Sequence, residues 1–287
     1  MILKFKYFSI TPIIIGLFFL FGCGSGGYNI EKGDVKDTTK YKSTGAKLKN
    51  FYKIKSAPLF TLQVSSGLNL GMAELSSNYS SVLDTQQFLE GQNFGVRTGF
   101  GFMVIGKIPL HKEGNVRLNV STGYNRFQSD FFTSKSPYGS VGYNVLSIGV
   151  GLENSFSPSF RLKPYIAGEI QANFISGKAN LNNLTNNTTR TVTIKNTFRI
   201  GYMIYSGLEY MLSNRFGINV GLKVTNANQV LKKSEPNENP NEINIRDKKV
   251  IEGPLEFGGF KNFTFTTFFV GVNFYMGIKD IVYQFNK

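Results

Sequence analysis

Apolar and polar residues alternate along eight segments of this chain, and the last segment shows the pattern most plainly. Between residues 268 and 279, one set of alternate positions is mostly small, polar or charged, and the other set is apolar. The apolar set is Phe268, Val270, Val272, Phe274, Met276 and Ile278. Successive side chains of a β-strand point to opposite faces, so this segment is predicted to be a strand with one apolar face. Comparable segments begin at Phe60, Phe94, Val116, Leu146, Leu162, Phe198 and Phe216, and the chain is therefore predicted to be all-β.

Two aromatic residues just before the last segment break its alternation. Phe263 and Phe265 fall on the opposite set of positions from Phe268. One extra residue in a strand changes the face that the following side chains occupy, so we expect a β-bulge near Thr266 and Thr267.

The connections between the segments alternate in length. Long connections are predicted at residues 73–92, 128–143, 176–191 and 226–259. Short connections are predicted at residues 108–115, 154–158 and 213–214. In barrels of the bacterial outer membrane, short turns lie on the periplasmic side and longer loops lie outside the cell. The sequence therefore predicts an eight-stranded antiparallel up-and-down transmembrane β-barrel with both of its ends on the periplasmic side.

The chemistry of the two strand faces indicates which face meets lipid. The apolar set is bulky and almost free of charge, and the opposite set carries many mid-strand glycines. These glycines are Gly99, Gly101, Gly149, Gly151, Gly201, Gly221 and Gly271. The interior of an eight-stranded membrane barrel has room only for side chains, and small residues interspersed with charged ones suit that space. The apolar set is therefore predicted to face lipid.

Residues 58–279 resemble the small OmpA/OmpX-type outer-membrane barrels and the related outer membrane protein β-barrel domains. The resemblance rests on strand number, periodicity and loop lengths. It implies this fold and a location in the outer membrane of a Gram-negative cell, and it implies no particular activity. Such barrels often end on an aromatic residue that the insertion machinery reads, a role expected here for Phe285 or for the segment 274–278.

The first residues predict export from the cytoplasm. Lys4 and Lys6 precede an apolar run that ends at Leu20-Phe21-Gly22-Cys23, the pattern of a signal peptide over residues 1–22. These last four residues resemble the lipobox of bacterial lipoproteins, which implies acylation of Cys23; cleavage near residues 22–26 with an incidental Cys23 is the alternative. Residues 23–57 are poor in hydrophobic residues and are predicted to form a flexible periplasmic linker. Residues 280–287 are predicted to form a C-terminal tail.

Composition narrows the partners and the chemistry. The formal net charge is +14, from 32 basic and 18 acidic residues. The expected partners are outer-membrane lipid and other envelope proteins or cell-wall polymer. Nucleic acid is not expected, because the basic residues are dispersed and the chain is predicted to be exported. One Cys and one His are too few for a protein-only zinc site, so we expect neither a metal nor a cofactor.

Charged residues also occur among the positions predicted to face the lumen. They are Arg97, Arg117, Glu153, Lys163, Glu169, Arg199, Glu209 and Lys223. Buried charges must be paired or hydrated, so we expect a salt-bridge network that plugs the lumen. A narrow, gated ion path is the alternative.

The sequence offers little support for catalysis. The only histidine, His111, falls in a predicted periplasmic turn, and Asp84 and Asp130 fall in predicted outer loops without a recognisable partner. The Asn-rich stretch at 180–191 and the charged stretch at 232–249 are interpreted as solvated loops. We therefore expect a non-enzymatic barrel with a structural, adhesive or complex-assisting role through its loops and tether. A soluble lipocalin-like lipoprotein that binds an apolar ligand, a gated pore and a lipid-modifying enzyme are the alternatives.

Overall fold

The structure is a computed structural model, and it describes most of the chain beyond residue 50. The described residues are 51–55, 57–76, 94–111, 114–133, 136–156, 161–183, 188–235, 239–248, 250–252, 255–257, 261–278 and 280–284. The predicted signal peptide, Cys23, Asp84 and Phe285 lie outside them.

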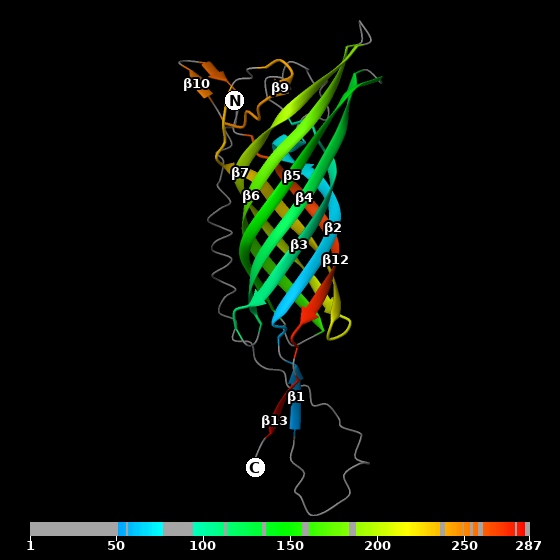
Figure 1. The fold of residues 1–287 in the computed structure, drawn as a ribbon, viewed down its shortest axis with the longest axis vertical. Coiled ribbons are helices and arrows are strands. Elements are labelled where there is room, and N and C mark those ends of the chain that lie inside the picture. The colour runs from blue at the N-terminus through cyan, green and yellow to red at the C-terminus, as the bar shows by residue number, and fades with distance from the viewer. Residues whose placement is uncertain are drawn as a thin grey trace, which may run out of the picture. The chain divides into compact units, whose positions relative to one another are not determined.

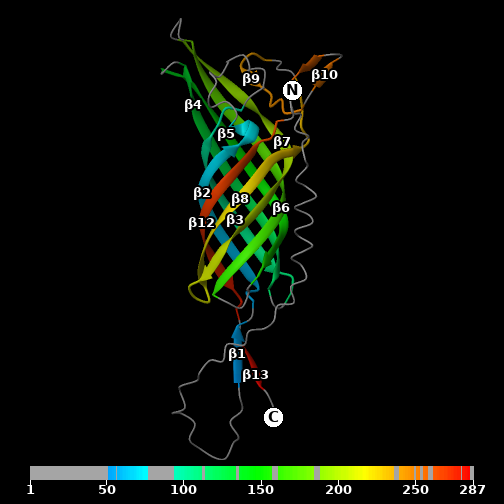
Figure 2. The same cartoon turned by 180° about the vertical axis from the view of Figure 1, so that it is seen from behind.

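Eight long antiparallel strands form a closed barrel (Figures 1 and 2). They are β2 (Phe60–Met72), β3 (Thr98–Pro109), β4 (Val116–Thr133), β5 (Ser136–Ser155), β6 (Leu162–Asn183), β7 (Thr188–Met211), β8 (Phe216–Val230) and β12 (Thr264–Met276). Each strand pairs with the next in the chain from β2 to β8, and β12 closes the ring by pairing with both β8 and β2. The predicted fold class is confirmed.

Short elements accompany the eight strands that form the barrel wall. They are β1 (Phe51–Lys55), η1 (Ala73–Leu75), β9 (Glu242–Ile243), β10 (Val250–Glu252), β11 (Leu255–Phe257) and β13 (Asp280–Gln284). Strand β1 falls in the predicted linker and β13 in the predicted tail, and the two pair antiparallel with each other, Phe51 opposite Gln284. These two segments therefore contain backbone structure that the sequence did not indicate. None of the described helices is long and apolar enough to cross a membrane.

An apolar belt surrounds the barrel near its short turns. Outward side chains in the belt include Leu68, Phe100, Val120, Ile148, Ile170, Val220, Phe268 and Val270, all exposed. A soluble carrier would turn these residues inward, whereas a membrane barrel presents them to lipid. The closed ring also leaves no strand edge in the belt, as the hydrocarbon core requires. The protein is therefore a barrel of the bacterial outer membrane, with its short turns at the periplasmic end.

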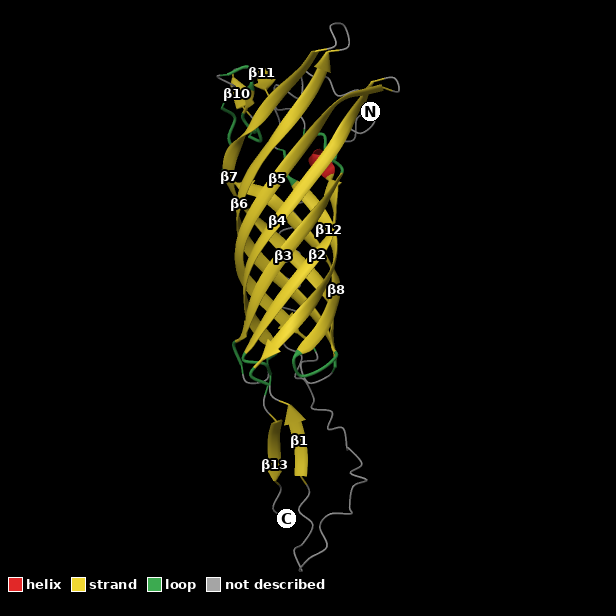
Figure 3. Ribbon diagram, turned by 45° about the vertical axis from the view of Figure 1, so that its right-hand side comes forward, coloured by secondary structure: helices red, strands yellow, loops and turns green. Residues whose placement is uncertain are grey.

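Strands β4, β5, β6 and β7 extend farther than the other barrel strands at the outer end (Figure 3). We call residues 126–133, 136–145, 175–183 and 188–197 the outer extension; they belong to β4, β5, β6 and β7. The predicted long connections at 128–143 and 176–191 were therefore mostly wrong, because these residues are largely strand. The reason is that the chemistry of the two faces is reversed here: inward residues such as Val141 and Ile175 are apolar, and outward residues such as Gln128 and Thr193 are exposed and polar.

The reversed faces give the outer part of the barrel a hydrophobic core. This core contains aromatic rings from β4, β5 and β12 together with aliphatic side chains from β6 and β7. The ring of Phe263 makes edge contacts with the rings of Phe94, Phe127 and Tyr143, with centroids 5.2, 5.6 and 5.5 Å apart. Edge-to-face pairs of this kind add to the stabilisation from apolar burial.

This core also explains two differences from the predicted strands. The pairing of β12 runs from Thr264 to Met276 without a register shift, so the predicted bulge is wrong. Phe265 points inward on the same face as Phe269, into the apolar upper lumen. Phe94 and Val96, predicted to face lipid, are also buried in this core, because they precede β3 and Gly95 between them has a φ of 65°.

Candidate functional site: the filled lumen and the outer wall

The periplasmic half of the lumen contains a connected set of ion pairs. Lys107 Nζ lies 2.6 Å from Glu153 Oε2, and Arg117 Nη1 lies 3.3 Å from Glu153 Oε1 and 3.1 Å from Glu209 Oε2. Lys163 Nζ lies 3.9 Å from Glu209 Oε1. All five side chains are buried. We call Lys107, Arg117, Glu153, Lys163 and Glu209 the lower ion-pair cluster.

The strand register brings this cluster together. Arg117 is directly opposite Glu153 on β4 and β5, and Lys163 is directly opposite Glu209 on β6 and β7. The Arg117–Glu209 contact then joins β4 to β7 across the lumen. Tyr275 of β12 donates a hydrogen bond to Glu209 Oε1 at 2.9 Å. The cluster therefore links strands from opposite walls of the barrel.

Glu169 forms a second polar group farther up the lumen. Its carboxylate accepts hydrogen bonds from Ser121 Oγ at 2.5 Å and from the Tyr205 hydroxyl at 2.8 Å. Lys223 is buried as well, and its Nζ lies 3.9 Å from Met103 Sδ. Polar hydrogen-bonding side chains thus continue the filling of the lumen above the lower ion-pair cluster.

A third group lies farther toward the outer end, where β7 and β8 meet the loop between β8 and β12. The guanidinium of Arg199 donates to both carboxylate oxygens of Asp247, each at 2.9 Å. Asn228 Nδ2 donates to Asp247 Oδ2 at 2.8 Å, and the backbone N–H of Lys233 donates to Asp247 Oδ1 at 2.9 Å. We call Arg199, Asn228 and Asp247 the mouth latch.

The mouth latch holds part of the loop between β8 and β12 inside the barrel wall. Strand β9 pairs in parallel with β7, with Glu242 opposite Thr193. Ile243, Ile245 and Asp247 then alternate inward and are 4 %, 6 % and 0 % exposed. The interpretation of residues 232–249 as a solvated loop is therefore wrong for this part. The loop is mostly polar, so the alternation of its three inward residues, Ile243, Ile245 and Asp247, is not evident from the sequence.

Two lysines near the mouth have lowered pKa values. Burial, and then the positive charge of Arg246, lower the pKa of Lys261 to about 8. Burial also lowers the pKa of Lys232, with a smaller opposing effect from Asp247. Lys232 Nζ donates to the carbonyl oxygen of Lys261 at 3.0 Å, so the two residues are packed together. Protonation of these two lysines therefore destabilises the folded protein.

The structure distributes the eight charged residues of the predicted lumen network over different levels. Arg117, Glu153, Lys163 and Glu209 lie together, Glu169 and Lys223 lie in the middle group, and Arg199 lies in the mouth latch. Arg97 is only half-buried and precedes β3; its backbone N–H donates to Ser129 Oγ at 3.0 Å. Sequence reasoning missed Lys107 and Asp247. Lys107 lies on the same alternate positions of β3 as Met103 and Ile105, which point inward. The alternation along this strand therefore predicts its position in the lumen.

The residues considered for catalysis lie far apart. His111 is exposed in the turn between β3 and β4 at the periplasmic end. Asp130 is exposed near the opposite end of β4, about 45 Å along that strand by its rise per residue. Within the described ranges, no group of His, Cys, Asp or Glu residues could hold a metal ion. His111 and Asp130 therefore cannot act on one substrate atom together.

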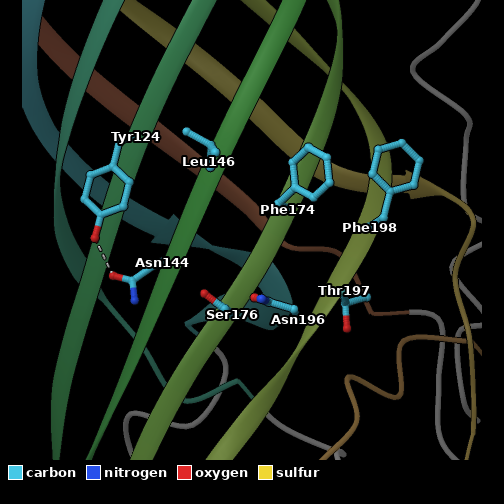
Figure 4. Close-up of a pocket in the computed structure, with 8 residues that line it drawn as sticks. All are labelled: Tyr124, Asn144, Leu146, Phe174, Ser176, Asn196, Thr197 and Phe198. Carbon is cyan, nitrogen blue, oxygen red and sulfur yellow. Dashed lines mark hydrogen bonds between the residues drawn. The ribbon is translucent and has the colours of Figure 1, made fainter.

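A groove lies on the outer wall of the barrel where the apolar belt ends (Figure 4). It is open along its outer side and has a volume of about 530 Å³. Its lining residues, which define the outer-wall groove, are Tyr124, Asn144, Leu146, Phe174, Ser176, Asn196, Thr197 and Phe198. Tyr124 donates a hydrogen bond to Asn144 Oδ1 at 2.7 Å, and the rings of Phe174 and Phe198 are 5.2 Å apart.

No protein-family model matches the chain, and no curated protein matches it in sequence. Among solved structures, Neisserial surface protein A is similar at 13 % identity and a TM-score of 0.42, covering 77 % of this chain and 99 % of its own. The N-terminal β-barrel domain of Pseudomonas aeruginosa OprF is similar at 12 % identity and a TM-score of 0.32, covering 76 % and 99 %. The outer-membrane protease OmpT of Escherichia coli is similar at 10 % identity and a TM-score of 0.33, covering 85 % and 100 %.

Proposed function

We propose that this chain is a non-enzymatic, non-conducting outer-membrane barrel that carries a rigid outer extension for contact with other molecules. The contact role is adhesive or complex-assisting. The observation that carries the proposal is the filling of the lumen at three levels by the lower ion-pair cluster, the Glu169 group and the mouth latch.

Buried charges in this arrangement favour a plug over an ion path. Arg117 and Glu209 contact each other across the lumen, and both are almost fully buried. A permeant ion would have to separate charge pairs that lack access to water, which costs several kcal/mol for each uncompensated ion. Above them, aromatic and aliphatic side chains fill the same space. The alternative of a narrow gated pore therefore has less support.

The outer extension supports the contact role. Its strands are hydrogen-bonded to one another well beyond the belt, as in Asn180 opposite Thr191. It also contains an apolar core of its own, with Val192 and Ile194 buried. A packed, hydrogen-bonded platform loses little conformational entropy when it binds a partner.

Conductance measurements test the proposal. The purified full chain is inserted into planar phospholipid bilayers, with a general porin as the positive control. We expect no unitary current steps for the wild-type protein. Regular current steps at neutral pH would contradict the non-conducting role, and turnover of peptide or lipid substrates by the same preparation would contradict the non-enzymatic role.

A further inference from the structure

We propose that the outer-wall groove binds an outer-leaflet lipid that has a phosphorylated sugar headgroup. This inference goes beyond the proposed function, because it concerns the lipid-facing wall and is independent of the lumen. It rests on the shape of the groove, on the order of its apolar and polar residues, and on the basic residues beside it.

The groove has two rows of side chains that match the two parts of a lipid. The strand register places Tyr124, Leu146, Phe174 and Phe198 opposite one another across β4, β5, β6 and β7. Next to this apolar row, on the outer side, Asn144 is opposite Ser176. In Figure 4 the four apolar side chains form one row and the polar ones form a second. Acyl chains fit the first row, and a headgroup fits the second.

A register shift between β6 and β7 shapes the polar row. Ile175 is opposite Thr197, but Gly177 is opposite Ile194, so Lys195 and Asn196 together face the single residue Ser176. This is the geometry of a β-bulge, which redirects side chains. Both Lys195 and Asn196 are exposed as a result. The bulge therefore adds a cation and an amide to the same outward surface.

Two more cations stand beside the polar row. Arg126 is directly opposite Asn144 and is exposed. Lys178 is exposed two residues beyond Ser176 on the same face of β6, a spacing of about 7 Å along the strand. Arg and Lys bind phosphate oxygens through charge-assisted hydrogen bonds. Amides and hydroxyls between these cations suit sugar hydroxyl groups better than the small headgroup of a simple phospholipid.

The chain has no tryptophan, which gives a direct assay. A Phe198→Trp variant places the only indole in the groove, and a Phe268→Trp variant places it in the belt on β12. Each full-length variant is reconstituted in phosphatidylcholine with brominated acyl chains, which quench indole fluorescence. Lipid A, a diphosphorylated and acylated glucosamine disaccharide without bromine, is then titrated in. Recovery of fluorescence gives the association constant of lipid A relative to phosphatidylcholine at each position.

We expect this relative constant to be about tenfold larger for Phe198→Trp than for Phe268→Trp, which corresponds to about 1.4 kcal/mol. Replacing Arg126, Lys178 and Lys195 by Gln in the Phe198→Trp background should remove most of the difference. The matched control replaces three exposed basic residues elsewhere, Arg215, Lys233 and Lys248, by Gln and should retain it.

Two results would overturn the proposal. Equal relative constants at the two positions would mean that the groove is ordinary lipid-facing wall. Protection of the Phe198→Trp indole from the brominated lipid before any lipid A is added would mean that a second copy of the chain covers the groove. Because neither readout depends on conductance, failure here is distinguishable from failure of the proposed function.

Discussion

Arg199 and Asp247 form a bidentate ion pair near the outer mouth, with both hydrogen bonds at 2.9 Å, although 48 positions separate the two residues in the chain. The pair joins the barrel wall to a loop whose polar composition predicts a solvated position.

Breaking the mouth latch should release the inserted loop. The Asp247→Ala change leaves Arg199 buried without its partner, and loss of one member of a buried pair costs about 3–5 kcal/mol. We expect faster tryptic cleavage between residues 232 and 261 in micelles, with the barrel itself still folded. Glu235→Gln is the control, because its pair with Lys233 is exposed and should change stability by less than about 1 kcal/mol. An unchanged cleavage rate for Asp247→Ala would show that the loop is held by its apolar residues alone.

Removal of one carboxylate from the lower ion-pair cluster should destabilise the barrel. Glu209 contacts Arg117, Lys163 and Tyr275, so Glu209→Gln leaves an excess of buried positive charge. We expect the free energy of unfolding in urea and detergent to fall by about 3–5 kcal/mol. Adding Lys163→Met should recover part of that loss, which a double-mutant cycle measures. Simple additivity of the two changes would contradict a coupled cluster.

Interior glycines should differ in their tolerance of a methyl group. A Cβ at Gly151 would lie 2.0 Å from the carbonyl oxygen of Gly168, whereas a Cβ at Gly123 would lie 3.5 Å from its nearest neighbour, the carbonyl oxygen of Phe102. Gly151→Ala should therefore destabilise the barrel by about 1–3 kcal/mol. Gly123→Ala should be neutral or stabilising by up to about 1 kcal/mol. Heat-modifiability on gels gives a rapid comparison of the two, and equal effects would contradict the difference in packing.

Substitutions that introduce a charged side chain can locate the outer boundary of the apolar belt. Ile148 is exposed within the belt, and Thr193 is exposed on the outer extension. Ile148→Arg should destabilise the inserted barrel by about 2–4 kcal/mol, because an arginine would enter the hydrocarbon region. Thr193→Arg should have little effect because its side chain meets water. Unfolding of both variants from phosphatidylcholine vesicles measures this, and a large loss for Thr193→Arg would move the boundary outward.

The lowered pKa of Lys261 predicts a dependence of stability on pH. Its pKa is about 8 in the folded protein and about 10.4 in an unfolded chain, so the unfolded state binds more protons between these values. Stability should therefore rise as pH increases from about 8 to about 10.4. At lower pH this lysine is protonated in both states, so its destabilising effect stays constant and adds no pH dependence. The rise should be smaller than the roughly 3 kcal/mol that the full difference would give at about 1.4 kcal/mol per unit of pKa, because solvent screens a partly exposed charge. Lys261→Met should remove it, whereas Lys233→Met, at an exposed site, should retain it; equal slopes in all three proteins would contradict the assignment.

The strands of the apolar belt were predictable because apolar outward and polar inward residues alternate along all of them. Outward residues such as Val220 and Val270 are apolar, and inward residues such as Asn219 and Asn273 are polar. That alternation identified all eight strands and the face that meets lipid. The same rule failed above the belt, where Phe263 and Phe265 are inward and apolar. A bulge was inferred from the change of chemistry, but the strand continues without one and only its surroundings change.

The filling of the mouth was harder to predict for a different reason. Asp247 belongs to a loop with few apolar residues, and its position depends on Arg199 and Asn228, which lie on β7 and β8. Pairings between distant segments leave no periodic signal in the sequence. The outer-wall groove likewise depends on a register shift between β6 and β7 that alternation alone does not reveal.

The uninterrupted strands of the outer extension also have a mechanical consequence. β6 and β7 contain 22 and 24 residues, roughly 70–80 Å of extended chain, whereas the hydrocarbon core is about 30 Å thick. A pulling force applied at their outer tips would act along the strands and load many ladder hydrogen bonds in shear at the same time. Tension applied there would therefore reach the membrane through the hydrogen-bonded strands themselves.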